Sequence, residues 1–502
     1  MRRWAPVVAL TALSFLTRLP ALLNAPGTNS DAAIVALQAR HIMHREWSPF
    51  LWGSGYQTSA DSTWVALVFA VCGKTPIALM LSALSLYVAL TLIAYCTLRR
   101  RLAPWSAFVA TLPLVFTTAC VHSYALYPPR QLALTVAFAA ICAIDAGTVA
   151  GLSLGGFCAV FAWVCDPYAA IFVPACLALA IATVLRARDE LLPRARALGA
   201  FFAGAACGAV LLALLFSHPR AQEGVASMSF DVIGHNAKLF FSECLPWTIG
   251  TKIFRPLHVM DYAEWKMPRA YAVVTWIGAA SLALSMIAAG AYALRSASRP
   301  LRALAAIAWM TIAANVASFF VSRMVMDQFS MRYLAASVLM LPFALAPLVD
   351  RFGARVASLA LAPYLFVAFV GGWLAHGRWV RGVLPARVDD GVVESRVLRA
   401  LEERHVEAAI ADYWASYRLA FLWREAIPIV PYHAAQDRYP PWRDAYAKST
   451  RVAYVYDRDR SFEDPKIAER EIVQNATIVD RFTSERFDVV VIDRASGSAT
   501  AR

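Results

Sequence analysis

The segment MRRWAPVVALTALSFLTRLPALLNAPGTNSDAAIVALQARHI, residues 1–42, places one long apolar run directly before a lone aspartate, Asp31. Residues 4–23 are long enough to cross a bilayer as one helix, which takes roughly 20 apolar residues. The run could also be a secretory signal peptide, but it ends in RLP at residues 18–20, where a cleavage site has small residues. We therefore expect a retained first span, with Asp31 just beyond it.

The amino-acid composition indicates a polytopic membrane protein. Of the 502 residues, 59% are hydrophobic and 16% are charged, and the mean hydropathy is +0.53, whereas soluble domains are nearer half apolar and a quarter charged. The net charge of +13 fits basic cytoplasmic loops, attraction to anionic lipids, or a phosphate-bearing substrate. The sequence has no compact basic domain, so the positive charge does not indicate a nucleic-acid partner. The spacing of the nine cysteines matches neither a metal site nor a disulfide framework. We therefore expect them to act as small buried apolar side chains.

Eleven apolar segments are candidate membrane spans. They predict a polytopic α-helical membrane protein whose domain of residues 1–375 lies in the lipid bilayer. The segments lie near residues 4–23, 76–98, 105–121, 131–147, 148–165, 168–185, 197–216, 271–294, 303–321, 333–349 and 356–375.

The connections between these segments indicate an orientation. With the N-terminus inside, the inner connections are short and rich in arginine, as the positive-inside rule requires. These connections are residues 99–104, 186–196, 295–302 and 350–355. The outer side then receives loop 24–75, loop 217–270 and everything after about residue 376.

Residues 376–502 are predicted to form a separate α/β domain on the outer face. Apolar residues recur at helical spacing in residues 391–406. Short strands rich in Val and Ile are expected at residues 407–412, 427–432, 452–457 and 487–494. The helix expected for YWASYRLAFLWRE, residues 413–425, is too aromatic and apolar for a free surface, so we expect it to pack on another part of the protein.

The first outer loop begins with a polar segment and a predicted helix. Asn29, Ser30 and Asp31 precede an amphipathic pattern, with Ile34 on its apolar side and Arg40 on its polar side, which predicts an interfacial helix along the membrane surface. Any of the three polar residues could cap this helix, and an acid there is favoured by the helix dipole. Asp31 therefore has two interpretations: a helix cap, or a carboxylate that takes a proton from an incoming hydroxyl or amine.

A second acid, Asp61, ends the same loop, which is rich in Trp, Gly and Tyr. Asp61 could be another cap or a ligand, and the tryptophans suit either membrane-interface anchoring or stacking on sugar rings. Arg332 and Tyr333 lie where an outer loop enters a late span. An arginine at this depth either extends its charge to the interface or binds a lipid-linked phosphate through bidentate contacts.

Other outer connections contain further polar groups. Asp166, between two predicted spans, is a weak site candidate because a carboxylate there must be paired or solvated. A polar cluster without a definite role comprises His122, Tyr124, Tyr127 and Arg130. In loop 217–270, His235 and Glu243 could be imagined as metal ligands, but their spacing resembles no metal motif and a solvated loop is favoured.

Several of these segments, taken in order, resemble the GT-C glycosyltransferases, in particular bacterial relatives of the protein O-mannosyltransferases (family 39-like) and the lipid A aminoarabinose transferases. RLP closes the first span and SDAAIVALQARHI opens the first outer loop as in that branch, but Ala32 stands where its members usually have glutamate. GSGYQTSADSTWVALVFAVCG, residues 53–73, resembles the segment that enters the second span, with Asp61 where many members have an acid. MRYLAASVLMLP, residues 331–342, resembles a recurring late span, and residues 411–441 resemble an outer-domain segment of some bacterial members.

The resemblance implies a polyprenyl-phosphate sugar donor and transfer with inversion on the outer, periplasmic face of the bacterial inner membrane. It implies Asp31 as the catalytic base and Arg332 as the group that holds the lipid phosphate. The implied substrate-binding set is Asp61, Tyr56, Arg332, Tyr333 and Arg130. The acceptor stays open between protein, lipid and glycan. No metal ligand is assigned, and a divalent metal cofactor stays open because the superfamily has metal-dependent and metal-independent members.

Two other classes of protein remain as alternatives. A transporter or flippase for a lipid-linked or small solute would have ionisable residues deep in its spans and paired broken helices. Few charges fall at mid-span here, and the polar groups gather at the outer ends of the spans, which favours chemistry at the outer face. A non-catalytic assembly or sensor protein would use the C-terminal domain as its binding module.

Overall fold

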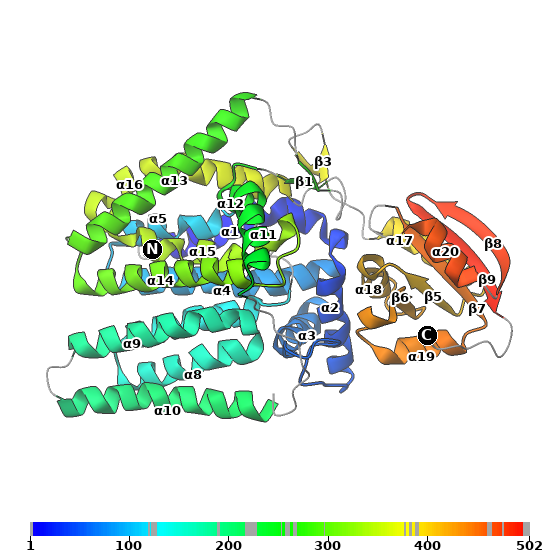
Figure 1. Cartoon of the computed structure of the whole chain (residues 1–502), viewed down its shortest axis with the longest axis horizontal. Helices are drawn as coiled ribbons and strands as arrows, with labels where there is room; N and C mark the ends of the chain where they lie inside the picture. The colour runs from blue at the N-terminus through cyan, green and yellow to red at the C-terminus, as the bar shows by residue number, and fades with distance from the viewer. Residues whose placement is uncertain are drawn as a thin grey trace.

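The chain folds into a bundle of apolar helices with a small mixed sheet beyond one end (Figure 1). The computed structural model describes residues 4–118, 121, 128–187, 191–215, 228–252, 254–256, 262–264, 269–295, 297–375, 378–380, 384–386, 391–458, 464–473 and 476–494. Most helices of the bundle run side by side, and α2 and α3 lie at the end that faces the sheet.

Apolar helices build the bundle because each helix satisfies its own backbone hydrogen bonds while its side chains face other helices or lipid. They are α1 (Ala5–Leu23), α4 (Pro76–Arg99), α5 (Pro104–Val115), α7 (Gln131–Asp145), α8 (Val149–Cys165), α9 (Val173–Ala187), α10 (Leu191–Leu215), α13 (Arg269–Arg295), α14 (Arg299–Val321), α15 (Ala335–Leu339) and α16 (Leu341–Ala375). Aromatic side chains such as Phe138, Phe172 and Phe343 contact one another in the core.

Helices α8 and α10 approach each other through glycines. A Cβ atom on Gly156 would lie 2.1 Å from the carbonyl oxygen of Phe201, and one on Gly204 would lie 1.9 Å from that of Ser153. Only residues without a side chain allow the two backbones to come this close, as is common between helices in membranes.

Each predicted span falls on apolar helix in the structure, and a polytopic helical membrane protein is confirmed. Among the described residues, seven helices are long and apolar enough to cross a membrane, whereas α5, α7 and α8 are shorter. The last two predicted spans are joined in α16, which is interrupted at Gly353 (φ 74°, ψ 167°), within the predicted connection 350–355. The count of eleven spans stays a prediction.

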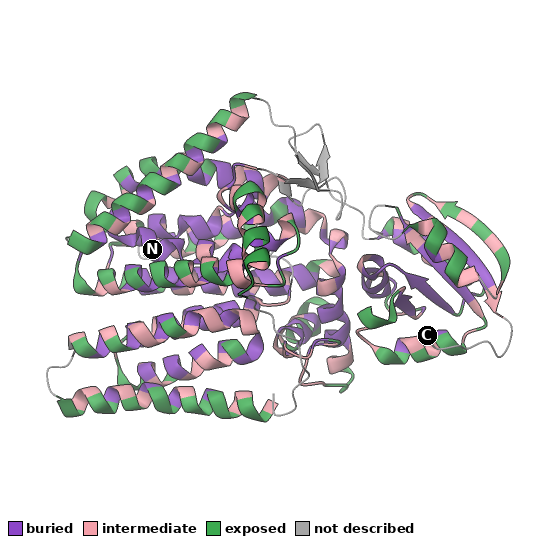
Figure 2. Ribbon diagram, in the orientation of Figure 1, coloured by how far each residue is buried: buried purple, intermediate pink, exposed green. Residues whose placement is uncertain are grey.

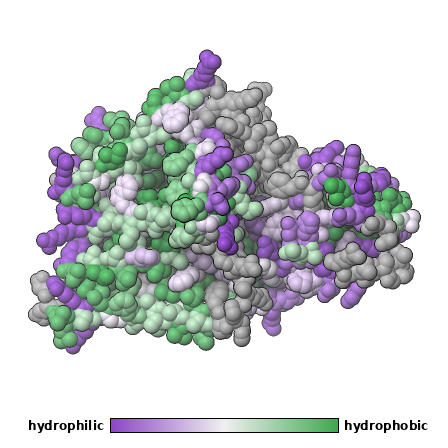
Figure 3. Space-filling view, viewed as in Figure 1, coloured by the Kyte–Doolittle hydropathy of each residue, from purple (hydrophilic) through white to green (hydrophobic). Residues whose placement is uncertain are grey.

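Charged side chains lie at the ends of the bundle. At the end away from the sheet, Arg100 and Arg101 contact Asp145 with N–O distances of 3.3 and 2.6 Å. The C-terminal end of α9 and the N-terminal end of α10 lie toward this same end (Figure 1). Next to these polar groups, the visible surface of the bundle is largely apolar (Figure 3). Which end faces the cell interior stays a prediction.

The C-terminal sheet has five strands in the order β6-β5-β7-β9-β8. Strand β5 pairs in parallel with β6 and β7, and β9 pairs antiparallel with β7 and β8. The elements of this region are α17 (Val392–Glu403), β5 (Ala408–Ala411), α18 (Tyr413–Leu422), β6 (Ile429–Pro431), η6 (Ala434–Gln436), α19 (Pro440–Lys448), β7 (Arg451–Asp457), α20 (Pro465–Val473), β8 (Ala476–Ser484) and β9 (Phe487–Arg494).

Strands β5, β6, β7 and β9 coincide with the predicted strand segments. The pattern did not predict β8, α19 or α20. Strand β8 is an edge strand and is mostly exposed or half-buried, so its sequence lacks the apolar run that identifies an inner strand. The division of the chain at residue 375 into two domains stays a prediction.

Helices α2 (Ser30–Met43) and α3 (Ala60–Cys72) belong to loop 24–75 and lie between the bundle and the sheet (Figure 1). Every residue from Ala32 to Arg40 is buried, because α3 and α18 both pack against α2 (Figure 2). The prediction of a polar, membrane-surface side of this helix is therefore wrong at Arg40. Arg40 is buried and lies 3.6 Å from a carboxylate oxygen of Glu425 in the C-terminal region.

Short elements complete the described structure. They are η1 (Ala25–Gly27), η3 (Pro167–Phe172), α11 (Phe230–Leu239), the π-helix η4 (Phe240–Cys244), α12 (Leu245–Ile249), η5 (Gln328–Leu334), and the two-stranded pairs β1 (Phe254–Pro256) with β2 (Tyr262–Glu264) and β3 (Arg378–Val380) with β4 (Leu384–Ala386). His122, Tyr124 and Tyr127 of the predicted polar cluster lie outside the described residues.

Candidate active site

Asp31 lies in the first turn of α2, and its carboxylate contacts the C-terminal region. Asn29 caps this helix, since its side-chain oxygen accepts a hydrogen bond from the backbone N–H of Ala32 at 2.9 Å. The interpretation of Asp31 as the cap is therefore wrong, although an acid in the first turn still interacts favourably with the helix dipole. The hydroxyl of Tyr413 donates to Oδ1 of Asp31 at 2.6 Å. Among the described residues, none donates a hydrogen bond to Oδ2.

Arg130 lies in a second polar group, which we call the Arg130 node and define as Arg130, Asp166, Gln57, Tyr168 and Tyr333. Nε of Arg130 donates to Oδ2 of Asp166 at 3.0 Å, and the same oxygen accepts from Nε2 of Gln57 at 2.6 Å. The guanidinium carbon lies 5.5 Å from the ring centre of Tyr168 and 5.8 Å from that of Tyr333, within cation–π range. A carboxylate and two aromatic rings therefore hold a largely buried positive charge.

Asp61 supports the backbone of the Arg130 node. Its Oδ2 accepts from the backbone N–H of Arg130 at 2.9 Å, and its Oδ1 accepts from that of Leu132 at 3.1 Å. Arg130 has a φ of 101°, in the left-handed region that disfavours residues with a side chain, so these bonds help to hold a strained backbone. Burial raises the pKa of Asp61 to about 6, against the two amide hydrogen bonds that lower it. Direct contact of Asp61 with substrate stays a prediction.

Tyr56 is a half-buried tyrosine that feels the charges of both groups. Burial raises the pKa of Tyr56, the positive charge of Arg130 opposes that rise, and the carboxylate of Asp166 adds to it. Tyr56 is also within electrostatic range of Arg438, a residue that in turn interacts with Asp31. The tyrosine therefore interacts electrostatically with Arg130 and with Arg438.

Arg332 is exposed beside the node. Its Nη2 donates to the hydroxyl of Tyr333 at 3.2 Å, and its guanidinium carbon lies 5.1 Å from the centre of that ring. The backbone oxygen of Tyr333 accepts from the hydroxyl of Tyr168 at 3.0 Å and from Nδ2 of Asn315 at 2.6 Å. The structure thus brings Tyr56, Arg130, Tyr333 and Arg332 into one region, with Arg332 on its exposed side.

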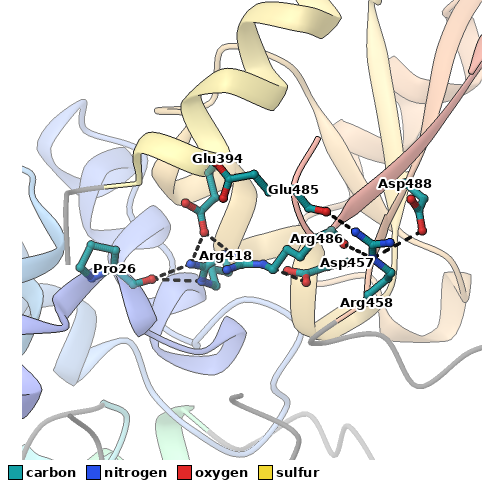
Figure 4. Close-up of polar contacts among 8 residues, drawn as sticks. All are labelled: Pro26, Glu394, Arg418, Asp457, Arg458, Glu485, Arg486 and Asp488. Carbon is teal, nitrogen blue, oxygen red and sulfur yellow. Dashed lines mark hydrogen bonds and ion pairs between the residues drawn. The ribbon is translucent and has the colours of Figure 1, made fainter. Parts of the chain in front are cut away.

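A buried ionic network within the C-terminal region supports Arg418, which donates hydrogen bonds to loop 24–75 (Figure 4). Arg418 of α18 donates to the carbonyl oxygen of Pro26 from Nη2 at 2.8 Å and from Nε at 3.1 Å. Arg418 and Arg486 also donate to the same oxygen of Glu394 at 2.5 and 2.6 Å. Burial alone would raise the pKa of Glu394, but the charges of Arg418 and Arg486 bring it down to about 2. The network continues through Asp457, Arg458, Glu485 and Asp488.

A second contact joins the other end of α2 to the same domain. The imidazole of His41 lies between two carboxylates, with Nδ1 at 2.5 Å from Glu46 and Nε2 at 2.8 Å from Glu425. Trp52 stacks on Tyr439, with ring centres 4.2 Å apart. Loop 24–75 and the C-terminal domain therefore meet along the length of α2.

The acidic side chains of this region do not form a metal-binding set. Both oxygens of Asp61 accept from backbone amides, and Asp166 is paired with Arg130. Glu243, imagined as a ligand, contacts Trp247 at 3.3 Å and Lys252 at 2.9 Å. In the part of the chain that the structure describes, no three His, Cys, Asp or Glu side chains gather around one point.

Sequence reasoning missed Tyr413 and Arg438. Both lie in residues 411–441, a segment that resembles an outer-domain segment of the family but whose role that resemblance does not specify. The aromatic excess in residues 413–425 predicts a packed helix face, and α18 does pack on α2. Nothing in the pattern identifies Asp31 as the carboxylate that Tyr413 meets.

Comparisons with known proteins identify the fold. No protein-family model matches the chain, and no curated protein matches it. The crystal structure of ArnT from Cupriavidus metallidurans bound to undecaprenyl phosphate is similar over 99% of both chains, with a TM-score of 0.57 and 12% sequence identity. The apo state of the same protein is similar over 97% of both chains, with a TM-score of 0.56 and 13% identity.

A second, larger protein has a related structure. Arabinofuranosyltransferase AftD from Mycobacteria is 14% identical with a TM-score of 0.50, and the similarity covers 99% of this chain but 42% of AftD. At these low identities the likeness shows the fold alone. The chain has the GT-C fold of membrane glycosyltransferases, as the sequence resemblance predicts.

Proposed function

We propose that this protein is an integral-membrane glycosyltransferase that moves a sugar from a polyprenyl-phosphate donor to an acceptor on the outer face of a bacterial inner membrane. One observation carries the proposal: loop 24–75 holds Asp31 and also reaches the Arg130 node. Tyr413 donates to Asp31, and its neighbour Arg438 donates to Gly53 of this loop, whose Gln57 donates to Asp166 of the node. The GT-C fold supports it, as does the similarity to ArnT, whose structure was solved with undecaprenyl phosphate bound.

In the proposed reaction, Asp31 accepts the proton of an acceptor hydroxyl or amine. The acceptor atom bonds to the anomeric carbon while the bond from that carbon to the phosphate oxygen breaks, so the configuration at the carbon inverts. The electron pair leaves with the polyprenyl phosphate. The guanidinium groups of Arg130 and Arg332 stabilise the negative charge that develops there, and Tyr56 and Tyr333 supply hydroxyl groups and rings around the sugar.

Divalent metals occur in some members of the superfamily, but the acidic groups here do not fit one. Asp61 and Asp166 already accept from amide or guanidinium donors, which leaves Asp31 without a neighbouring carboxylate free to complete a site among the described residues. The proposed steps therefore use only the side chains named above.

Transport is the main alternative, and it requires ionisable groups along a path through the spans. Arg18 in α1 is fully buried, and its guanidinium donates to the carbonyl oxygens of Val115 at 2.6 Å and Leu114 at 3.2 Å. These hydrogen bonds satisfy carbonyl groups at the C-terminal end of α5, so Arg18 has a structural role. We therefore retain glycosyl transfer as the one proposed function.

The variant Asp31→Asn tests the proposal. The full-length protein in lipid nanodiscs is given radiolabelled undecaprenyl-phosphate mannose, glucose or aminoarabinose with membrane extract as acceptor, and released undecaprenyl phosphate and labelled product are measured. Loss of a general base typically lowers a rate about 100- to 10,000-fold, and we expect Asp31→Asn to fall in that range. Asp444→Asn, an exposed change in the C-terminal domain, should retain the wild-type rate. A folded Asp31→Asn protein with wild-type transfer would refute the assignment of the base.

A further inference from the structure

The phenol of Tyr413 links the C-terminal domain directly to the proposed base. Its hydroxyl donates to Oδ1 of Asp31 at 2.6 Å, and its own backbone oxygen accepts from the hydroxyl of Ser30 at 2.7 Å. Tyr413 opens α18, where the side chain of Asp412 accepts from the backbone N–H of Trp414 at 2.8 Å. The side chain is 8% exposed. The backbone of Tyr413 therefore docks on the start of α2, and its hydroxyl separately contacts one oxygen of the carboxylate.

Arg438 lies against the same phenol. Its Nη2 is 3.5 Å from the hydroxyl oxygen of Tyr413, and its guanidinium carbon is 5.5 Å from the ring centre. Nη1 donates to the carbonyl oxygen of Gly53 at 2.6 Å, and the backbone N–H donates to the hydroxyl of Tyr417 at 2.6 Å. Gly53 has a φ of 63°, and a Cβ there would lie 2.3 Å from Cδ of Arg438, so glycine allows this close approach.

The protonation state of Tyr413 suits a permanent donor. Burial, and then the negative charge of Asp31, raise the pKa of Tyr413 well above its ordinary value. The phenol therefore keeps its proton at any working pH and donates to Oδ1. The other oxygen, Oδ2, accepts from none of the described residues, so it is the oxygen that can face an acceptor.

We propose that Tyr413 is a positioning residue for Asp31 and that Arg438 holds Tyr413 in place, so that the C-terminal domain completes the active site. The inference rests on the proposed glycosyl transfer and adds that a residue from each half of the chain is needed for it. Without the phenol, the carboxylate can rotate and turn Oδ2 away from the acceptor. A misplacement of about 1 Å can slow a reaction about 100-fold.

The variant Tyr413→Phe removes the hydroxyl and leaves the ring. In the assay described above, we expect kcat to fall at least about tenfold while KM for undecaprenyl-phosphate sugar stays within about twofold, because the groups proposed to bind the phosphate are unchanged. Tyr446→Phe is the matched control, since Tyr446 is a buried tyrosine of α19 in the same domain whose hydroxyl bonds to no described residue. It should retain the wild-type kcat.

Ser30→Ala separates positioning from simple docking. It removes another hydrogen bond at the same joint and leaves the contact between Tyr413 and Asp31 intact. We expect its kcat to stay within about threefold of wild type, since hydrogen bonds that only dock the domain contribute modestly. Equal losses in Ser30→Ala and Tyr413→Phe would mean that Tyr413 only docks the domain, and would overturn the proposal.

A double-mutant cycle tests whether Tyr413 acts through Asp31. On the residual rate of Asp31→Asn, adding Tyr413→Phe should cost less than about twofold, because the partner is already changed. The same fold loss on both backgrounds would overturn the proposal. If Tyr413→Phe fails to give folded protein by size exclusion and thermal melting, Arg438→Gln replaces it in the same cycle, with a smaller loss of kcat expected.

The outcomes separate this inference from the proposed function. If the wild-type protein transfers sugar and needs Asp31, but Tyr413→Phe and Arg438→Gln leave kcat unchanged, the positioning inference is wrong and the function stands. If the wild-type protein uses none of the donors, or Asp31→Asn is fully active, the proposed function or its base is wrong, and the inference falls with it.

Discussion

We expect the variant Glu394→Gln to destabilise the C-terminal domain by about 3 kcal/mol. The carboxylate of Glu394 is buried, and one of its oxygens accepts from Arg418 at 2.5 Å and from Arg486 at 2.6 Å (Figure 4). Glutamine keeps the shape of the side chain but removes its negative charge. Two guanidinium groups then remain in the interior without the anion that balances them.

The magnitude follows from the pKa of Glu394, which the two arginines lower from 4.5 to about 2 against the effect of burial. Each pKa unit corresponds to about 1.4 kcal/mol, so the shift is equivalent to about 3 kcal/mol. Removing one partner of a buried ion pair typically costs about 3–5 kcal/mol, in agreement. Because the folded pKa is lowered, this stabilisation is complete above about pH 4.5 and is lost as the pH falls toward 2.

Hydrogen exchange of the full-length protein measures the effect. Peptides from α17 and β9 of Glu394→Gln should exchange about 100-fold faster than wild type at pH 7, since every 1.4 kcal/mol is about tenfold. Glu402→Gln is the matched control, because Glu402 is exposed on the same helix. The difference between variant and wild type should shrink to about 1 kcal/mol near pH 3. Equal exchange in Glu394→Gln and Glu402→Gln would refute the reasoning.

Two further predictions concern the joint and the bundle. Burial alone would lower the pKa of His41, but hydrogen bonds to Glu425 and Glu46 raise it. The charged imidazole therefore stabilises the fold fully below about pH 6.5, and this stabilisation is lost as the pH rises through the raised pKa. The melting temperature of wild type should fall more between pH 6 and pH 9 than that of His41→Gln; parallel curves would contradict this. In α10, Gly204→Ala should lower the melting temperature in detergent, because the new Cβ meets a carbonyl oxygen of α8. Gly199→Ala is the control and should not lower it, because the space around Gly199 is open. Equal melting temperatures of the two variants would exclude the close packing of α8 and α10.

The sequence by itself located the apolar helices and the inner strands of the small sheet. A membrane span needs a continuous apolar run whatever its neighbours are, and an inner strand is apolar on both faces, so both leave a local pattern. The burial of Arg40 on α2 could not be predicted from its own segment, because α18 covers it and the distant Glu425 pairs with it. The edge strand β8 could not be predicted from the sequence either, because its side chains are mostly exposed or half-buried and leave no apolar run.

The candidate site divides in the same way. Asp31, Arg130 and Arg332 could be selected from the sequence because charged groups beside apolar runs are conspicuous, and family resemblance added the order in which they occur. The partners of Asp31 could not, since the hydrogen bond from Tyr413 joins residues 382 positions apart. That contact forms where hydrogen bonds from Arg418 to Pro26 and the burial of α2 bring two distant parts of the chain together. Local sequence patterns carry no record of such a docking, so tertiary structure alone decided which groups surround the carboxylate.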